Sequence, residues 1–111
     1  IIMQHEKRRF VPKVDYVTSP GWIDGPDGRR RLGLVPDKGP IAVVTTLGVM
    51  RFDEKTKRMY LAEYYPGVTI EEITRETGFG LDVSRAVEAE PPSEEVLRIL
   101  REKVDPDHIY V

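Results

Sequence analysis

The sequence predicts an α/β fold, and three stretches of the chain carry that prediction. A continuous apolar run at 41–46 is typical of a strand, and a polar tip at 54–58 lies between two further strand-like segments. Two helix starts follow, at Thr69 and Ser93, and both are followed by acidic residues in the first turn. A chain of 111 residues that combines these elements predicts one domain, spanning 1–111.

The first forty residues carry less regular patterns. The opening Ile1–Gln4 predicts the end of a buried strand. The apolar positions of 10–17 predict a second extended segment, which Pro12 confines to an edge, a bend or a short strand. From the turn at 19–21 to Pro40 the chain is rich in glycine and proline, which predicts a long loop. We expect this loop to cover a neighbouring subunit or a sheet edge rather than to carry chemistry.

The middle of the chain predicts a strand followed by an antiparallel hairpin. The β-branched run at 41–46 suits a strand that is covered on both faces. The segments 49–53 and 59–64 flank the polar tip and form the two arms of the hairpin. In the second arm we expect Met59 and Leu61 to face one side of the sheet and Tyr60 to face the other.

The predicted helix at 70–77 has the clearest boundaries. Thr69 and Glu72 match a capping box, and Gly78 is the expected left-handed terminator. A second helix is expected to start at Ser93, after two prolines, and to end before Pro106. Its apolar residues recur at helical spacing and are Val96, Leu97, Leu100 and Val104.

Composition narrows the classes of function. Seventeen basic and 19 acidic residues give a formal charge of −2, so the overall charge gives no reason to expect binding to nucleic acid. The arginine triplet at 29–31 is poor evidence for such binding. The absence of cysteine excludes thiol nucleophiles and cysteine-based zinc sites, and fits a cytoplasmic protein. Two distant histidines predict no metal site. No apolar run approaches the roughly 20 residues that span a bilayer, so we expect no membrane role.

One long stretch resembles a known family. Residues 43–78 read VVTTLGVMRFDEKTKRMYLAEYYPGVTIEEITRETG. They resemble the C-terminal part of the β subunit of family I coenzyme A transferases, which has a VVTDLGVF…F…L…PGVTVEEV…TGF run. The preceding HEKRRFVPKVDYVTSPG, at 5–21, is similar to the glutaconate CoA-transferase branch. The main departure is Thr46, where the family usually has Asp or Asn. The resemblance implies part of the open mixed sheet of a CoA-transferase β subunit, with the helices from Thr69 and Ser93 packed on it.

The resemblance also implies a reaction. Family members exchange CoA between an acyl-CoA and a carboxylic acid, of the glutaconate or 3-oxo acid type, in an oligomer that includes an α subunit. One glutamate attacks the acyl-CoA and then holds CoA as a thioester, so the CoA thioester is a substrate and no permanently bound cofactor is implied. Relatives are longer, and this glutamate is expected upstream of Ile1. We therefore expect a fragment that is inactive alone, and its catalytic residue stays unassigned.

Two residues are candidate substrate-binding groups, His5 and Ser19. His5 opens a charged cluster directly after an apolar strand, where ligands collect in open α/β sheets. It could donate to a substrate carboxylate or to the thioester carbonyl, while Arg8 or Arg9 could bind an acid or a phosphate. Ser19 offers a hydroxyl in a turn. The charged cluster could instead be a solvated basic turn or form salt bridges at a subunit interface, with no role in substrate binding. Ser19 could likewise be part of a plain turn.

Two further functions remain open at this stage. Some relatives hydrolyse carbon–carbon bonds in ring-derived CoA thioesters, and the sequence does not separate that chemistry from CoA transfer. The other is a non-catalytic module that binds a partner through the loop at 22–40 and the apolar edge at Ile1–Met3.

Overall fold

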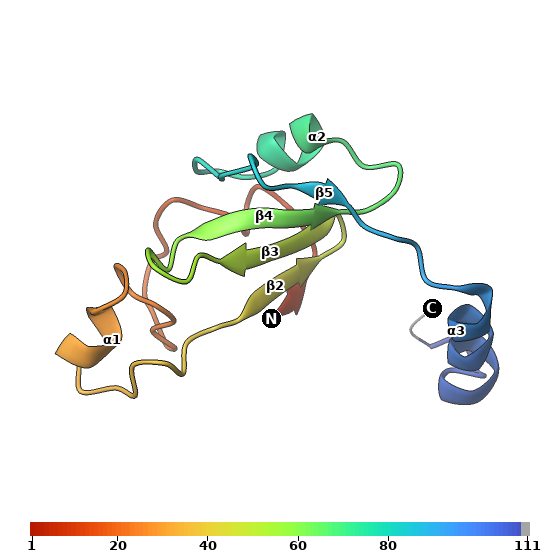
Figure 1. Cartoon of the computed structure of the whole chain (residues 1–111), viewed down its shortest axis with the longest axis horizontal. Helices are drawn as coiled ribbons and strands as arrows, with labels where there is room; N and C mark the ends of the chain where they lie inside the picture. The colour runs from red at the N-terminus through yellow and green to blue at the C-terminus, as the bar shows by residue number, and fades with distance from the viewer. Residues whose placement is uncertain (110–111) are drawn as a thin grey trace.

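The computed structural model describes residues 1–109, and its centre is a five-stranded sheet in the order β1-β2-β3-β4-β5 (Figure 1). The two outer pairs of strands, β1 with β2 and β4 with β5, are parallel, whereas β2, β3 and β4 pair antiparallel. The predicted open mixed sheet is therefore confirmed. The strands are β1 at Ile2–Met3, β2 at Ala42–Thr45, β3 at Gly48–Phe52, β4 at Met59–Tyr64 and β5 at Val87–Glu88.

The predicted hairpin is confirmed as β3 and β4. Met50 lies opposite Leu61, and both side chains are fully buried. The pairing shifts by one residue between Val49 and Met50, so the two ends of the hairpin do not keep one register. The tip is closed by Asp53, whose Oδ1 accepts from the Thr56 amide at 2.8 Å.

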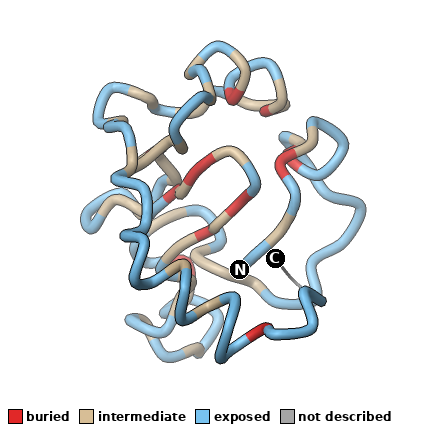
Figure 2. The backbone as a smooth tube through the Cα atoms, turned by 90° about the vertical axis from the view of Figure 1, so that its right-hand side faces the viewer, coloured by how far each residue is buried: buried red, intermediate tan, exposed pale blue. Residues whose placement is uncertain are grey.

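The core lies between one face of this sheet and helix α2, which spans Ile70–Arg75. Its buried side chains come from four elements and from the segment before Pro12, and Figure 2 shows the buried positions spread along the central strands. Full burial of such a side chain contributes roughly 1.5–3 kcal/mol. The buried apolar residues are Phe10, Val43, Met50, Leu61 and Ile73.

Strand β2 is covered on one face rather than on both. Val43 and Thr45 are buried, whereas Ala42 and Val44 are only half-buried, and Ile41 lies outside the strand at 80% exposure. The prediction of a strand covered on both faces was wrong because α2 packs against a single side of the sheet. β-branched residues suit either environment, so composition alone did not distinguish them.

The strand at the N-terminus pairs as expected but is not buried. β1 runs parallel to β2, with Ile2 opposite Val44. It is an edge strand, and Ile2 is 86% exposed. The apolar run at Ile1–Gln4 therefore belongs to an edge strand, and the prediction of a buried strand was wrong.

The extended segment predicted at 10–17 does not form a strand. Phe10 turns into the core, while Val14, Tyr16 and Val17 are exposed. Pro12 lacks an amide hydrogen and can serve a sheet only at an edge or a bulge, and no described strand includes it.

The long loop between Pro20 and Pro40 is ordered by its own contacts. The indole Nε1 of Trp22 donates to the Pro40 carbonyl at 2.8 Å, which closes the loop at its base. Arg29, in the short helix α1 at Gly28–Arg31, donates to the carbonyls of Gly21 and Val35. The loop lies beside the sheet at the end opposite to α3 (Figure 1).

Helix α2 begins at the predicted cap but ends differently. The hydroxyl of Thr69 accepts from the Glu72 amide at 3.1 Å, as predicted. Gly78 does not adopt the left-handed conformation expected of a terminator. It instead lies directly against the backbone of Phe10, because its amide donates to the Phe10 carbonyl at 2.6 Å.

The second predicted helix forms but stands away from the sheet. It comprises α3 at Glu94–Ile99, capped by Ser93, and the π-helical turn η1 at Leu100–Val104. Neither contains a buried residue, so the expected packing of this helix on the sheet was wrong (Figure 1). The two prolines at 91 and 92 hold the linker extended, away from the sheet. No helix in the described chain is long and apolar enough to cross a membrane.

Candidate functional site

His5 lies at the meeting point of three segments of the chain. Its Nδ1 is 3.2 Å from the hydroxyl of Thr45, at the end of β2, and its Nε2 is 3.0 Å from the hydroxyl of Thr77, after α2. The ring stacks on Phe10 with centroids 4.2 Å apart, and only 6% of the residue is exposed. The imidazole thus ties the N-terminal segment to both the sheet and the helix.

The hydroxyl contacts limit the protonation of His5. The Thr77 hydroxyl donates to the Ile73 carbonyl at 2.7 Å, so its oxygen presents lone pairs to Nε2. The hydroxyl of Thr45 can donate either to the Gly48 carbonyl, 2.9 Å away, or to the imidazole. In a neutral ring with the hydrogen on Nε2, Nε2 donates to the Thr77 hydroxyl and Nδ1 accepts from the Thr45 hydroxyl. Burial lowers the pKa of His5, against a smaller opposing effect of Glu76, and so favours this neutral form.

Thr46, where the sequence departs from the family, contacts the same residue. The Thr46 hydroxyl accepts from the backbone amide of His5 at 3.2 Å. Asp or Asn, which the resemblance leads one to expect at this position, would also offer an oxygen acceptor. The departure at Thr46 is therefore compatible with this hydrogen bond to His5.

The charged cluster after His5 folds into a turn. Glu6 Oε2 accepts from Nε of Arg8 and of Arg9, both at 2.8 Å, and these bonds lower the pKa of the Glu6 carboxyl. All three side chains remain solvent-accessible. The arrangement matches the solvated basic turn considered above, and exposed ion pairs of this kind contribute little to stability.

The structure places the two predicted substrate-binding residues in different environments. Ser19 is exposed, in the turn that precedes Gly21. Both ring nitrogens of His5 are already occupied by threonine hydroxyls, so His5 would have to exchange one of them to contact a substrate. Substrate binding by these two residues stays a prediction.

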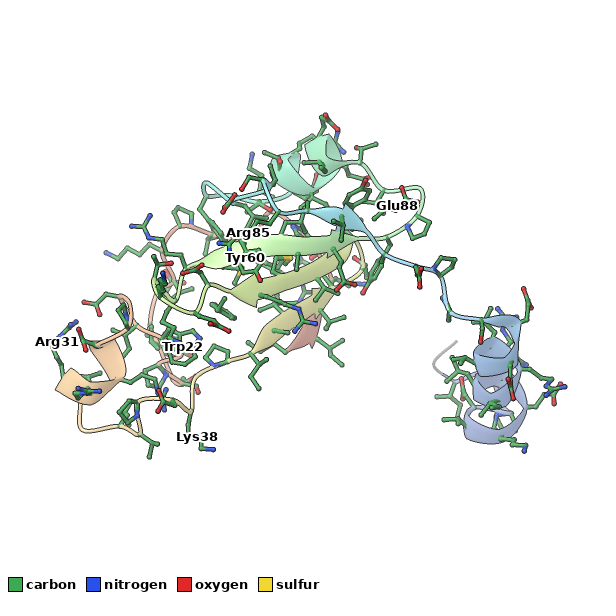
Figure 3. The ribbon with its side chains drawn as sticks, viewed as in Figure 1. Trp22, Arg31, Lys38, Tyr60, Arg85 and Glu88 are labelled. Carbon is green, nitrogen blue, oxygen red and sulfur yellow. The ribbon has the colours of Figure 1, made fainter. Side chains whose placement is uncertain are left out.

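A second cluster of functional groups surrounds Tyr60 and was not singled out from the sequence. The guanidinium carbon of Arg85 lies 3.9 Å from the centre of the Tyr60 ring (Figure 3). Arg85 also pairs with Asp53 at 3.1 Å and with Asp82 at 3.6 Å. The hydrogen bonds of Asp53 to Thr56 and to Arg85 hold the pKa of its carboxyl well below its usual range. No short motif links residues so far apart along the chain.

The described residues offer no metal site and no enclosed carboxylate. No cluster of three or more histidine, aspartate or glutamate side chains in residues 1–109 has the arrangement needed to hold a metal ion. None of the glutamates in this part of the chain is buried, and Glu54, Glu71, Glu94 and Glu95 are exposed. A nucleophilic carboxylate needs a site that excludes water, so the described residues give no candidate for one.

Comparison with known proteins identifies the class. The coenzyme A transferase family model matches residues 1–76, and the chain belongs to this family. The sequence is 60% identical to the B subunit of glutaconate CoA-transferase from Acidaminococcus fermentans over all 111 residues. It is 36% identical over 102 residues to the B subunit of 3-oxoadipate CoA-transferase from Pseudomonas knackmussii, with 91% of this chain aligned.

A solved structure agrees with the sequence comparison. The crystal structure of glutaconate coenzyme A-transferase from Acidaminococcus fermentans matches 98% of this chain with a TM-score of 0.93 and 60% identity. The alignments cover 42% and 39% of the two curated relatives, so the chain spans about two fifths of their length. The family and the fold predicted from the sequence are therefore confirmed.

Proposed function

We propose that the chain is part of the B subunit of a cytoplasmic CoA-transferase that moves CoA between an acyl-CoA and a carboxylic acid of the glutaconate or 3-oxo acid class. The observation that carries this proposal is 60% identity, along the whole chain, to the B subunit of a glutaconate CoA-transferase. The α, or A, subunit is the expected partner, because both curated relatives are named as B subunits.

The chemistry proceeds in two halves with one carboxylate as carrier. A glutamate attacks the thioester carbonyl and CoA leaves as a thiolate, which then attacks the resulting anhydride and releases the first acid. The glutamyl-CoA thioester next reacts with the second acid in reverse order, so atoms and charges balance. The exposed glutamates of this chain suit helix starts and turns, and we place the nucleophile outside these 111 residues.

Within this scheme we propose a role for two residues of the chain. His5, held by the hydroxyls of Thr45 and Thr77, anchors the turn at 6–9, and the exposed Ser19 contacts the substrate. Substitution Ser19→Ala in the assembled enzyme should raise KM for one of the acids without changing the free energy of unfolding. An unchanged KM for every substrate would remove Ser19 from the site.

The activity is tested by comparing the chain alone with the assembly. We expect a full B subunit that contains this sequence, together with its α partner, to exchange CoA between glutaconyl-CoA and acetate. The 111-residue chain alone should show no exchange, since it offers no enclosed glutamate among its described residues. Exchange by the isolated chain, or none by the assembly with either acid class, would contradict the proposal.

The alternative of a non-catalytic partner-binding module keeps one supporting observation. Ile1 and Ile2 are exposed at the sheet edge, and the neighbouring Ile41 is 80% exposed. An apolar edge of this kind usually marks an interface. The same surface also fits contact with another part of a transferase assembly, so the two ideas separate only in the exchange assay.

A further inference from the structure

The hydroxyl of Thr45 has four polar neighbours, and one of them is the His5 ring. Its oxygen accepts from the backbone amides of Leu47 and Gly48, at 3.2 and 3.1 Å. A hydroxyl has two lone pairs and one hydrogen, so these two amides fill its capacity to accept. Only its hydrogen is left for His5 Nδ1, 3.2 Å away, and the Gly48 carbonyl competes for that hydrogen. The site therefore requires Nδ1 to be an acceptor.

The other ring nitrogen faces a hydroxyl with the opposite role. The Thr77 hydroxyl gives its hydrogen to the Ile73 carbonyl at 2.7 Å, so towards Nε2 it acts as an acceptor. One accepting and one donating nitrogen define a neutral imidazole with its hydrogen on Nε2. A second proton would have to sit on Nδ1, pointing at a hydroxyl without a free lone pair. Because His5 is buried, solvent does not replace the missing acceptor.

The charged groups near the ring do not offset this loss. Burial lowers the pKa of His5 more than the facing carboxylate of Glu76, just after α2, raises it. Strand β2 brings no charged side chain. The other charges beside the ring are tied up in ion pairs, which join Glu6 to Arg8 and Arg9, and Arg75 to Glu76.

The contacts of His5 and Phe10 hold residues 5–10 against the rest of the fold, and we call these residues the His5 segment. The His5 amide donates to the Thr46 hydroxyl, and the Phe10 carbonyl accepts from the Gly78 amide. The turn at 6–9 lies between these two points. Since the Phe10 ring stacks on the imidazole, movement of one ring disturbs the packing of the other.

We propose that His5 is a pH-sensitive switch: a proton on Nδ1 breaks its hydrogen bond with Thr45 and releases the His5 segment, while the hairpin of β3 and β4 stays folded. The proton comes from solvent and remains on the released imidazolium, which water then solvates. The hydrogen of the Thr45 hydroxyl passes to the Gly48 carbonyl, 2.9 Å away, so its donor stays paired after release. This switch is a property of the chain and does not depend on CoA transfer.

Hydrogen exchange of the full 111-residue chain, from about pH 8 to about pH 5, tests the switch. The amides of His5 and Gly78 are the reporters, because both bond across the boundary of the His5 segment. Their protection factors, which already correct for the intrinsic effect of pH on exchange, should fall by up to about tenfold per pH unit below 6.5. The amides of β3 and β4 should keep their protection.

Three variants identify the titrating group. His5→Gln keeps one donor and one acceptor but does not titrate, so its protection factors should not change with pH. Glu76→Gln removes the charge that favours the imidazolium, so the loss of protection should move to lower pH. Glu71→Gln removes the same charge from the first turn of α2 and is the matched control, with no shift expected.

The nitrogen chemical shifts of the His5 ring test the unaltered protein directly. They should show the hydrogen on Nε2 in the neutral form, and a hydrogen on Nδ1 would overturn the switch. Loss of protection in β3 and β4 at the same pH would show global unfolding and would also overturn it. So would a pH dependence that persists in His5→Gln, or equal behaviour of the Glu76 and Glu71 variants.

Discussion

Gly78 donates its amide hydrogen to the carbonyl of Phe10 at 2.6 Å, and a β-carbon at Gly78 would lie 2.5 Å from that same oxygen. Their hydrogen bond joins the segment after α2 to the N-terminal segment, in which the Phe10 ring stacks on His5. A side chain of any size at position 78 must therefore push these segments apart.

The first prediction follows from this contact. Gly78→Ala should lower the free energy of unfolding by roughly 1–3 kcal/mol, the usual effect of overpacking. Gly80→Ala is the matched control, because a β-carbon there meets nothing within 4 Å. Urea unfolding of both variants measures the difference. Equal stability of the two would show that the backbone relaxes around position 78 at little cost.

The second prediction concerns pH. Burial lowers the pKa of His5 below its ordinary 6.5, so the unfolded chain takes up a proton at a higher pH than the folded one. Stability from this residue is fully present above pH 6.5 and decreases as the pH falls from there to the folded-state pKa. Unfolding curves at a series of pH values should show this decrease, and His5→Gln should abolish it.

A nuclear magnetic resonance titration of His5 with a midpoint above 6.5 would contradict the prediction directly.

The third prediction separates the two halves of the cap on α2. Thr69→Ala should cost about 0.5–2 kcal/mol, since the Thr69 hydroxyl satisfies the Glu72 amide. Glu72→Ala should cost less, because within the described residues its carboxylate makes no bond back to the Thr69 amide. Thermal unfolding of both variants measures the effects, and a larger loss for Glu72→Ala would be evidence for the full capping box.

The fourth prediction concerns α3 and η1. A helix of this length is marginal in water without packing, and no residue of either element is buried. In the isolated chain, amides of 97–104 should exchange with deuterium faster than those of β3 and β4. Addition of the partner assembly should slow them. Protection equal to that of the hairpin in the chain alone would show that the helix packs on the sheet in solution.

Local patterns predicted the parts of the fold that depend on neighbours in sequence. The hairpin at 49–64 and the caps at Thr69 and Ser93 are of this kind, and all are present. The environment of His5 depends on Thr77, which is 72 residues away, and no periodicity links the two. Gly78 was predicted to be a terminator because sequence cannot distinguish a glycine needed for left-handed backbone from one needed for close approach.

The apolar stripe of the last helix shows a different limit. Val96 and Val104 recur at helical spacing, which correctly predicted an amphipathic helix. The spacing shows which face needs a partner and not where the partner lies. Both residues are more than half exposed, so the sheet of this chain does not cover them.

The two edges of the sheet differ in how easily they accept another strand. β5 ends at Glu88 and is followed by Glu90 and the prolines at 91 and 92, and charges and prolines discourage strand addition. β1 has no such protection, since its neighbours are Ile1 and Gln4 and its own Ile2 is open to solvent. The β1 edge therefore leaves backbone amides and carbonyls open to an added strand, whereas the β5 edge is protected against one.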